Sequence, residues 1–318
     1  MHPGALGDVI LFGHLLSALG GRVTLLAGGE KGRLLKAAGV AAVAMDIDTL
    51  PIHEAFADTP LEQCRLPKLL GAHGRLISCL GGGDRQVEAR LAAMCRTEDA
   101  GFLPVRPPHD YPVHLLDLWA DLLGTPAIPS DPCPWKLDSK ALAAARQSLT
   151  GIAPEALHPS LVIHPGAGSP AKCWPLEKFL QLAKAFSSGG QQGGRQGGVV
   201  FVLGPVERER WPAGTAAEIA RGYTVLDCPS LIELAVVVQA ATVFVGNDSG
   251  AAHLAAAMGT PTVALFGPAR QEHFAPRGHI VTTVSAGDWA NVSVARVLEV
   301  LESLPRRPAG RCPEGVPE

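Results

Sequence analysis

One stretch, residues 242–259, constrains the fold most, because it holds a strand, a polar turn and a helix in immediate succession. The apolar run Thr242–Val245 is rich in β-branched and aromatic residues, which is typical of a buried parallel strand. An alanine-rich segment with good helix propensity follows, and the turn between them contains Asn247, Asp248 and Ser249. Open α/β sheets bind ligands at such turns. The stretch therefore predicts an α/β fold with a binding site beside Asp248.

The start of that helix is suited to an anion, because its free amides and the positive end of its dipole attract negative charge. A plainer interpretation stays open, in which Asp248 is an ordinary N-cap and binds nothing. N-caps of this type are common, so the stretch alone does not separate the two interpretations.

Strand-like and helix-like segments alternate along the whole chain, which predicts two doubly wound α/β domains facing a cleft. A length of 318 residues suits two domains, each with its own core. The proline-rich linker 124–135 is the best boundary, between domains 1–130 and 131–318. A helix is expected over 207–220, a loop with one short helix over 46–66, a flexible loop over 187–198 and a frayed tail from 305. The expected strands are 22–27, 40–45, 74–80, 102–105, 160–164, 199–203, 224–226, 242–245, 262–266 and 279–284.

The N-terminus begins with a turn where a strand is expected. Gly4 and Gly7 indicate a tight turn, and Asp8 leads an apolar helix from about Val9. Such a turn usually follows a strand of a βαβ unit. Either the fold does without that strand or the sequence has lost it, and we expect loss of the first strand of the N-terminal domain, through a start codon assigned too late. Residues 1–3 are too short to fill a central gap, so this domain should be the less stable half.

Composition excludes several classes of function. The net charge is −3 and the basic residues are scattered, which leaves no nucleic-acid footprint. With 47% hydrophobic and 18% charged residues the chain is globular. No apolar run approaches the roughly 18 residues of a membrane span and no signal peptide is evident, so we expect a soluble protein. The odd number of cysteines without metal-ligand spacing indicates reduced thiols in the cytoplasm. They are Cys64, Cys79, Cys95, Cys133, Cys173, Cys228 and Cys312.

Three more polar loops follow strands in the second half. In the first, Gly166 and Gly168 allow backbone amides to approach a ligand, Ser169 adds a hydroxyl and Lys172 a positive charge. This loop predicts a phosphate site, although an ordinary loop with a solvated lysine stays open.

The second loop contains Glu207, which could bind ribose hydroxyls, although an acid favoured by a helix dipole is the commoner role. The third contains Gly267 and Pro268. The three loops and the Asp248 turn together describe one anionic site of nucleotide size.

Four segments carry a resemblance to a known family: Gly4–Val9, His164–Pro175, Gly246–Gly250 and Gly259–Pro268. They resemble glycosyltransferase family nine, which includes the ADP-heptose:lipopolysaccharide heptosyltransferases. The resemblance is dense over 164–278 and weak over 40–138. It implies a GT-B fold of two Rossmann-like domains, with the donor sugar nucleotide in the second and the acceptor facing the first. It also implies inverting transfer without a required metal.

The resemblance assigns roles to individual residues. It makes Asp8 the proposed catalytic base, Lys172 the contact to donor phosphate, Asp248 the residue facing the donor sugar, and Glu207, more loosely, the ribose ligand. His164 and His253 more often hold turns through ring hydrogen bonds. The expected donor-binding set is His164, Gly166, Ala167, Gly168, Ser169, Lys172, Glu207, Asn247, Asp248, Ser249, Gly250, His253 and Gly267, with no metal ligands.

The expected function is sugar transfer, with heptose as one option, from a nucleoside diphosphate sugar to a hydroxyl acceptor, in cell-surface glycan or lipopolysaccharide biosynthesis. The resemblance favours ADP-heptose as donor and implies a glycan or lipid-linked acceptor, a cytoplasmic location and transient contact with the inner membrane. Basic residues are few over 46–70, so the acceptor stays open. The alternative is a non-catalytic sugar-nucleotide-binding protein with a degenerate acceptor domain. A dinucleotide oxidoreductase is disfavoured because no G-x-G-x-x-G follows a strand.

Overall fold

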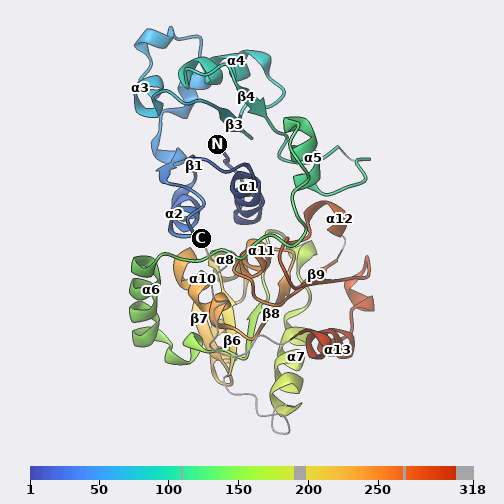
Figure 1. Ribbon diagram of the computed structural model, residues 1–318. Helices are drawn as coiled ribbons and strands as arrows, with labels where there is room; N and C mark the ends of the chain where they lie inside the picture. Colours follow the sequence, from blue (N-terminus) through green and yellow to red (C-terminus); the bar gives the residue numbers. More distant parts are fainter. Residues whose placement is uncertain (109, 190–197, 268–269, 306–318) are drawn as a thin grey trace. The chain divides into compact units, whose positions relative to one another are not determined.

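The computed structural model describes residues 1–108, 110–189, 198–267 and 270–305. The chain divides into two compact units, one of Met1–Ile128 and one that begins at Pro129 (Figure 1). Most of the segment 187–198, for which a flexible loop is expected, lies outside the described residues, as do Pro268 and the tail beyond 305.

The second unit contains a six-stranded parallel sheet in the order β10-β9-β8-β5-β6-β7. The expected buried strand is β8, and all five of its residues are buried. From β5 the chain proceeds to β6 and β7 on one side, and then crosses to β8, β9 and β10 on the other. The strands are β5 (Leu161–His164), β6 (Val199–Leu203), β7 (Thr224–Asp227), β8 (Val243–Asn247), β9 (Thr262–Phe266) and β10 (Val281–Ser285).

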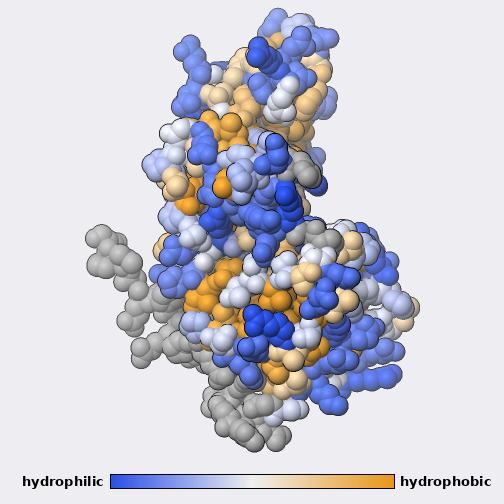
Figure 2. Space-filling model, turned by 90° about the vertical axis from the view of Figure 1, so that its right-hand side faces the viewer, coloured by the Kyte–Doolittle hydropathy of each residue, from blue (hydrophilic) through white to orange (hydrophobic). Residues whose placement is uncertain are grey.

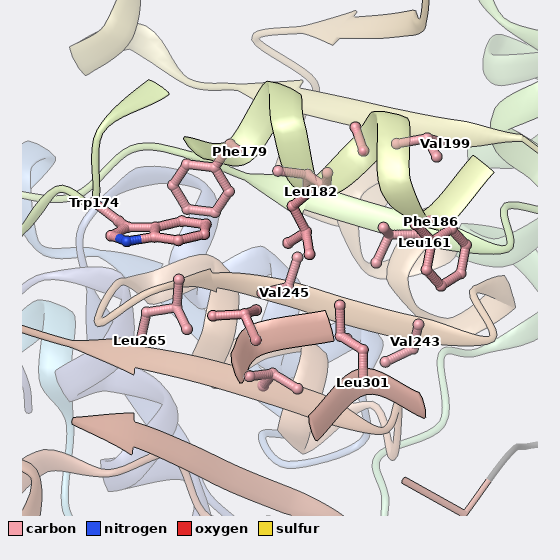
Figure 3. Close-up of a cluster of buried hydrophobic side chains, with 14 of the residues drawn as sticks. Leu161, Trp174, Phe179, Leu182, Phe186, Val199, Val243, Val245, Leu265 and Leu301 are labelled. Carbon is pink, nitrogen blue, oxygen red and sulfur yellow. The ribbon is translucent and has the colours of Figure 1, made fainter. Parts of the chain in front are cut away.

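Helices α7 and α13 cover one face of this sheet and enclose the larger part of its core. Figure 3 shows Phe179 and Leu182 of α7 above Val245 and Leu265 of the sheet, with Leu301 of α13 below. Trp174 packs edge-on against Phe179. The helices of the unit are α6 (Ser139–Ile152), α7 (Leu176–Gly189), α8 (Pro205–Arg210), α9 (Thr215–Ala220), α10 (Leu231–Ala240), α11 (Gly250–Ala257), α12 (Gln271–Phe274) and α13 (Val294–Ser303).

The single helix expected over 207–220 is wrong. Two short helices, α8 and α9, stand there instead. Trp211, which precedes Pro212, has an extended backbone with φ −84° and ψ 151°. A proline disfavours the helical conformation of the preceding residue, so the helix ends before Pro212.

The first unit has two separate two-stranded parallel sheets, β1-β2 and β3-β4. The region 46–66, for which one short helix is expected, contains three 3₁₀ turns. The strands are β1 (Thr24–Ala27), β2 (Val43–Asp46), β3 (Leu76–Ser78) and β4 (Ala100–Phe102). The helices are α1 (Leu6–Leu19), α2 (Gly29–Ala37), α3 (Leu66–Leu70), α4 (Arg85–Met94) and α5 (Leu115–Leu123), and the turns η1 (Ile47–Thr49), η2 (Ile52–Phe56) and η3 (Leu61–Gln63).

Met1 and His2 lie between the two small sheets and pair with both. The Met1 ammonium donates to the Ile77 carbonyl at 2.6 Å, and the Cys79 amide donates to the Met1 carbonyl at 2.9 Å. On the other side, the His2 amide donates to the Leu26 carbonyl at 2.9 Å. These residues therefore fill one end of the gap, which residues 1–3 were expected to leave unfilled.

Behind Met1 lies a cavity of about 380 Å³, lined by residues at the beginnings of β1 and β3, among them Leu25 and Leu76, and by Phe12 and Leu16 of α1. Burial lowers the pKa of the Met1 ammonium to about 6 and that of the His2 imidazole to about 3. At pH 7 the buried Met1 amine and the His2 imidazole are therefore mostly neutral.

We predict that four β-branched apolar residues added before Met1 will raise the melting temperature by roughly 5 °C or more. They would continue the parallel pairing and fill the cavity, and each buried methylene contributes about 0.8 kcal/mol. For a unit of this size 1 kcal/mol corresponds to roughly 4 °C. Calorimetry measures the shift, with a Gly-Ser-Gly-Ser extension as the matched control. Equal melting of the two extended chains would show that the cavity does not accept a strand.

Candidate functional site

The loops after β5 and β8 meet at the point where the strand order of the second sheet reverses. These strands are neighbours, with His164 opposite Gly246 in the ladder, yet the chain continues from them in opposite directions. A crevice forms at such a switch point, because the connections on either side turn away from each other. Residues predicted from two distant loops are therefore brought together at one place.

An ion pair between Lys172 and Asp248 joins the two loops. Lys172 Nζ donates to Asp248 Oδ2 at 2.6 Å. The Asp248 side chain is 7% exposed, whereas that of Lys172 is 39% exposed. The interpretation of Asp248 as a plain N-cap is wrong, because the N-cap of α11 is Ser249. The ammonium is thus held against a buried carboxylate while one side of it stays open to an anion.

The buried side chain of Asn247 ties β8 to the loop after β5. Its Oδ1 accepts from the Trp174 amide at 2.9 Å, and its Nδ2 donates to the Pro165 carbonyl at 2.7 Å. The oxygen and the nitrogen of this side-chain amide therefore both have hydrogen-bond partners in the backbone. Asn247, expected among the donor-binding residues, supports the shape of the loop through these two bonds.

His164, Gly166 and Glu207 pack tightly around the beginning of the same loop. His164 Nδ1 accepts from the Gly166 amide at 3.0 Å, which is the turn-holding role expected for this histidine. A Cβ on Gly166 would come within 1.7 Å of Glu207 Oε1, so only glycine fits. Glu207 is 4% exposed, and its Oε2 accepts from the Gly204 amide at 2.7 Å at the start of α8. Burial lowers the pKa of His164, and the negative charge of Glu207 opposes that shift.

Two buried polar atoms at the start of α11 lack hydrogen-bond partners among the described residues. They are Ser249 Oγ and His253 Nδ1, one turn apart on the helix that follows Asp248. Burial lowers the pKa of His253 to about 4, with Lys172 lowering it further and Asp248 opposing, so the imidazole is neutral at pH 7. Buried polar atoms in native proteins nearly always have partners, so a ligand or an ordered water is needed to satisfy these two atoms.

The other residues of the expected donor set lie on the loops after β5, β8 and β9, at the same edge of the sheet. The Gly168 carbonyl accepts from the Arg210 guanidinium at 3.3 Å, a contact that the sequence did not predict. Sequence reasoning also missed Trp289, whose indole Nε1 donates to the Ala171 carbonyl at 2.9 Å. The residues placed at this edge are Ala167, Gly168, Ser169, Gly250 and Gly267.

Asp8 lies in the first unit, in the first turn of α1. That helix begins at Leu6, three residues earlier than the sequence indicated. A Cβ on Gly4 would come within 2.5 Å of the His2 ring and 3.0 Å of Asp8 Oδ2, which explains the glycine in this turn. Lys31 Nζ donates to the Gly4 carbonyl at 2.7 Å and fixes the turn from the side of α2.

Among the described residues, no group of three or more histidine, cysteine, aspartate or glutamate side chains is placed to hold a metal ion. Within the same residues, no helix has the length and apolar character needed to cross a membrane. On the face shown in Figure 2, hydrophobic residues form separate groups among hydrophilic ones. The most exposed large apolar side chains include Ile152, Phe56 and Leu122.

Two successive α/β units, the second built on a six-stranded parallel sheet, define the GT-B fold class. Residues 114–299, more than half of the chain, match the model of glycosyltransferase family 9 (heptosyltransferase). The chain belongs to this family.

Curated relatives match over part of the chain. The chain is 30% identical over 166 residues to lipopolysaccharide heptosyltransferase 2 of Salmonella typhimurium, and this match covers 44% of the chain and 45% of the relative. It is 29% identical over 145 residues to lipopolysaccharide heptosyltransferase 3 of Escherichia coli K12, which covers 44% and 40%. The matches thus span less than half the length of these relatives.

Solved structures share the fold over nearly the whole chain. The family 9 glycosyltransferase of Veillonella parvula has a TM-score of 0.72 at 17% identity, covering 95% of this chain and 94% of the other. The heptosyltransferase WaaC of E. coli, solved with ADP, has a TM-score of 0.67 at 18% identity, covering 95% and 99%. At these identities the likeness shows the fold, and the predicted GT-B fold is confirmed.

We predict that stability falls as pH drops below about 8, where the buried Met1 amine lags behind the unfolded chain in binding a proton, and falls more steeply below about 6.5. His2, His164 and His253 are buried with lowered pKa values, so the unfolded chain binds protons there that the native protein does not. Each such imidazole lowers the free energy of unfolding by up to about 1.4 kcal/mol per pH unit between its unfolded and its folded pKa.

His253→Asn should reduce by one the number of protons that the unfolded chain binds and the native protein does not. Urea unfolding at intervals from pH 7.5 to 4.5 gives the free energy of unfolding as a function of pH. Below pH 6 this free energy should fall less steeply with decreasing pH in the variant than in the wild type, and above pH 7 the two curves should be parallel. An unchanged slope below pH 6 would show that His253 is not a buried neutral imidazole.

Proposed function

We propose that this chain is an inverting, metal-independent glycosyltransferase that moves a sugar from a nucleoside diphosphate sugar to a hydroxyl group of a glycan or lipid-linked acceptor. The observation that carries the proposal is the Lys172–Asp248 pair beside Ser249 Oγ and His253 Nδ1, which lack partners among the described residues. This arrangement offers the ammonium of Lys172 and the hydroxyl of Ser249 as donors to the oxygens of a phosphate, and the neutral imidazole of His253 as an acceptor for a ligand hydroxyl.

ADP-heptose is the proposed donor. Family membership supports it, as do the names of the curated relatives, which are lipopolysaccharide heptosyltransferases. The E. coli heptosyltransferase WaaC was also solved with ADP-2-deoxy-2-fluoro heptose. By the same reasoning the acceptor belongs to lipopolysaccharide or another cell-surface glycan. The proposed location is the cytoplasm, with peripheral contact to the inner membrane.

The chemistry needs charge stabilisation on the leaving group. As the bond from the anomeric carbon to the diphosphate oxygen breaks, negative charge grows on the diphosphate, where Lys172 and the first amides of α11 would stabilise it. Because these groups supply positive charge themselves, the proposed reaction requires no metal ion.

The other half of the reaction needs a base and a group that faces the sugar. The acceptor oxygen forms its bond to the anomeric carbon from the side opposite the diphosphate, which inverts the configuration, and its proton passes to the Asp8 carboxylate. The sugar develops positive charge in between, which the Asp248 carboxylate would stabilise.

A second candidate is a protein that binds sugar nucleotides without transferring the sugar. The observation that favours it is the gap in the first unit, where a cavity of about 380 Å³ lies behind Met1, between the beginnings of β1 and β3. An assay with ADP-heptose separates the two candidates. Release of free sugar or transfer of the sugar supports the transferase, and binding without either supports the binding protein.

We predict that Lys172→Ala weakens ADP binding by about 1.5–3 kcal/mol, because a hydrogen bond to a charged group is lost. This corresponds to roughly a 10- to 150-fold rise in Kd. Titration calorimetry measures the change, with the exposed Lys184→Ala on α7 as the matched control. Equal affinities of the Lys172 variant and the wild type would remove Lys172 from the site.

We predict different kinetic signatures for the two carboxylates. Asp8→Asn should lower kcat by roughly 10²- to 10⁴-fold with nearly unchanged nucleotide affinity, as expected for a base. Asp248→Ala should weaken binding of the sugar nucleotide as well as turnover, and should barely change the affinity for free ADP.

Melting curves of both variants must be measured to show that each is folded, because Asp248→Ala also removes the ion pair with Lys172. The division of roles is contradicted if both variants lose ADP affinity equally while remaining folded.

A further inference from the structure

Trp289 belongs to none of the motifs that the sequence points to, yet its indole contacts the turn that carries Lys172. It begins the 3₁₀ turn η7 (Trp289–Asn291), between β10 and α13. Its Nε1 donates to the carbonyl of Ala171, the residue before Lys172, at 2.9 Å. That carbonyl lies in η5 (Pro170–Lys172), a single 3₁₀ turn.

The same ring lies against the end of β9. A Cβ on Gly267 would come within 2.4 Å of the ring atom Cε2 and 2.6 Å of Cζ2 of Trp289, so the indole occupies the space that a side chain would take. Nearby on the same strand, the Leu265 carbonyl accepts from the Asp248 amide at 2.9 Å. The indole therefore connects the end of β9, to which the Asp248 amide is bonded, with the turn that contains Lys172.

Trp289 is itself fixed in place by Lys178 of α7. Lys178 Nζ donates to the carbonyls of Trp289 and Val292, both at 2.9 Å. Asp288 accepts from the Ala290 amide at 2.9 Å and caps the turn. Because α7 is a long helix packed on the core of the sheet, these bonds give the indole a rigid support.

We propose that Trp289 is a positioning residue that sets where the Lys172 ammonium stands. The side chain of Lys172 is long and flexible, so the position of its charge depends on the position of its backbone turn. The indole bond to Ala171 and the ring packed on Gly267 hold that turn against the end of β9. The effect on ligand affinity rests on the proposed nucleotide site, whereas the effect on Lys172 itself does not.

Trp289→Phe tests the inference directly, because it keeps a ring over Gly267 and removes only the N–H donor. Calorimetry should show ADP binding about three- to tenfold weaker than in the wild type, as expected for one hydrogen bond. Gly267→Ala, which displaces the ring, should weaken binding by a similar factor. Trp119→Phe is the matched control, since it removes an indole bond to the Pro104 carbonyl in the first unit, and should leave ADP affinity unchanged.

A double-mutant cycle shows whether Trp289 acts through Lys172. In the Lys172→Ala background, Trp289→Phe should cause no further loss of ADP affinity. The inference is overturned if the Trp289 variant loses the same factor in both backgrounds, or loses none in the wild-type background.

A second measurement needs no nucleotide. Acylation of lysines by acetic anhydride, followed by peptide mass spectrometry, should modify Lys172 at least twofold faster in Trp289→Phe than in the wild type, with Lys184 unchanged. An unchanged rate at Lys172 would overturn the positioning role. Absence of ADP binding by the wild-type protein would overturn the proposed function instead, so the two failures are distinguishable.

Discussion

The candidate site depends on one buried side-chain amide, that of Asn247. Asn247 bonds to the backbone at both ends of the loop after β5, at Pro165 and at Trp174. A buried amide that loses such partners costs about 1–3 kcal/mol for each unpaired group. The loop therefore has one stable shape relative to β8, and in that shape Lys172 reaches Asp248. The ion pair therefore depends on this connection between two adjacent parallel strands.

The second unit was largely predictable, because its four central strands, β9, β8, β5 and β6, are buried and therefore appear as continuous apolar runs. Strands β6 and β9 have the predicted bounds, and the others differ by a few residues. The first unit was less predictable, since its strands are shorter and its sheet is split. Pro212 is a local signal for the break within 207–220, because the helix ends at the residue before it. The role of Met1 and His2 depends on pairing with strands far along the chain, which no local pattern reveals.

Within the site, local motifs identified the loops but not the contacts that shape them. Glycines, a lysine and an aspartate after strands marked where a ligand approaches, and the structure brings Lys172 and Asp248 together. The packing of Glu207 against Gly166, and the bonds from Arg210 and Trp289, join residues from different loops. Such contacts arise from tertiary geometry, because the bond from Trp289 to Ala171 spans 118 residues of sequence. A single sequence contains no periodicity or spacing that indicates them.

The burial of Asp248 bears on which ligand the proposed site should accept. The carboxylate is 7% exposed and pairs with Lys172. A diphosphate on the open side of the Lys172 ammonium leaves this pair in place, so the buried carboxylate keeps its partner when ADP binds. A carboxylate accepts several hydrogen bonds, so Asp248 can also accept from hydroxyl groups of a sugar attached to the diphosphate. The pair therefore fits the proposed division of roles, in which Lys172 contacts phosphate and Asp248 contacts the sugar.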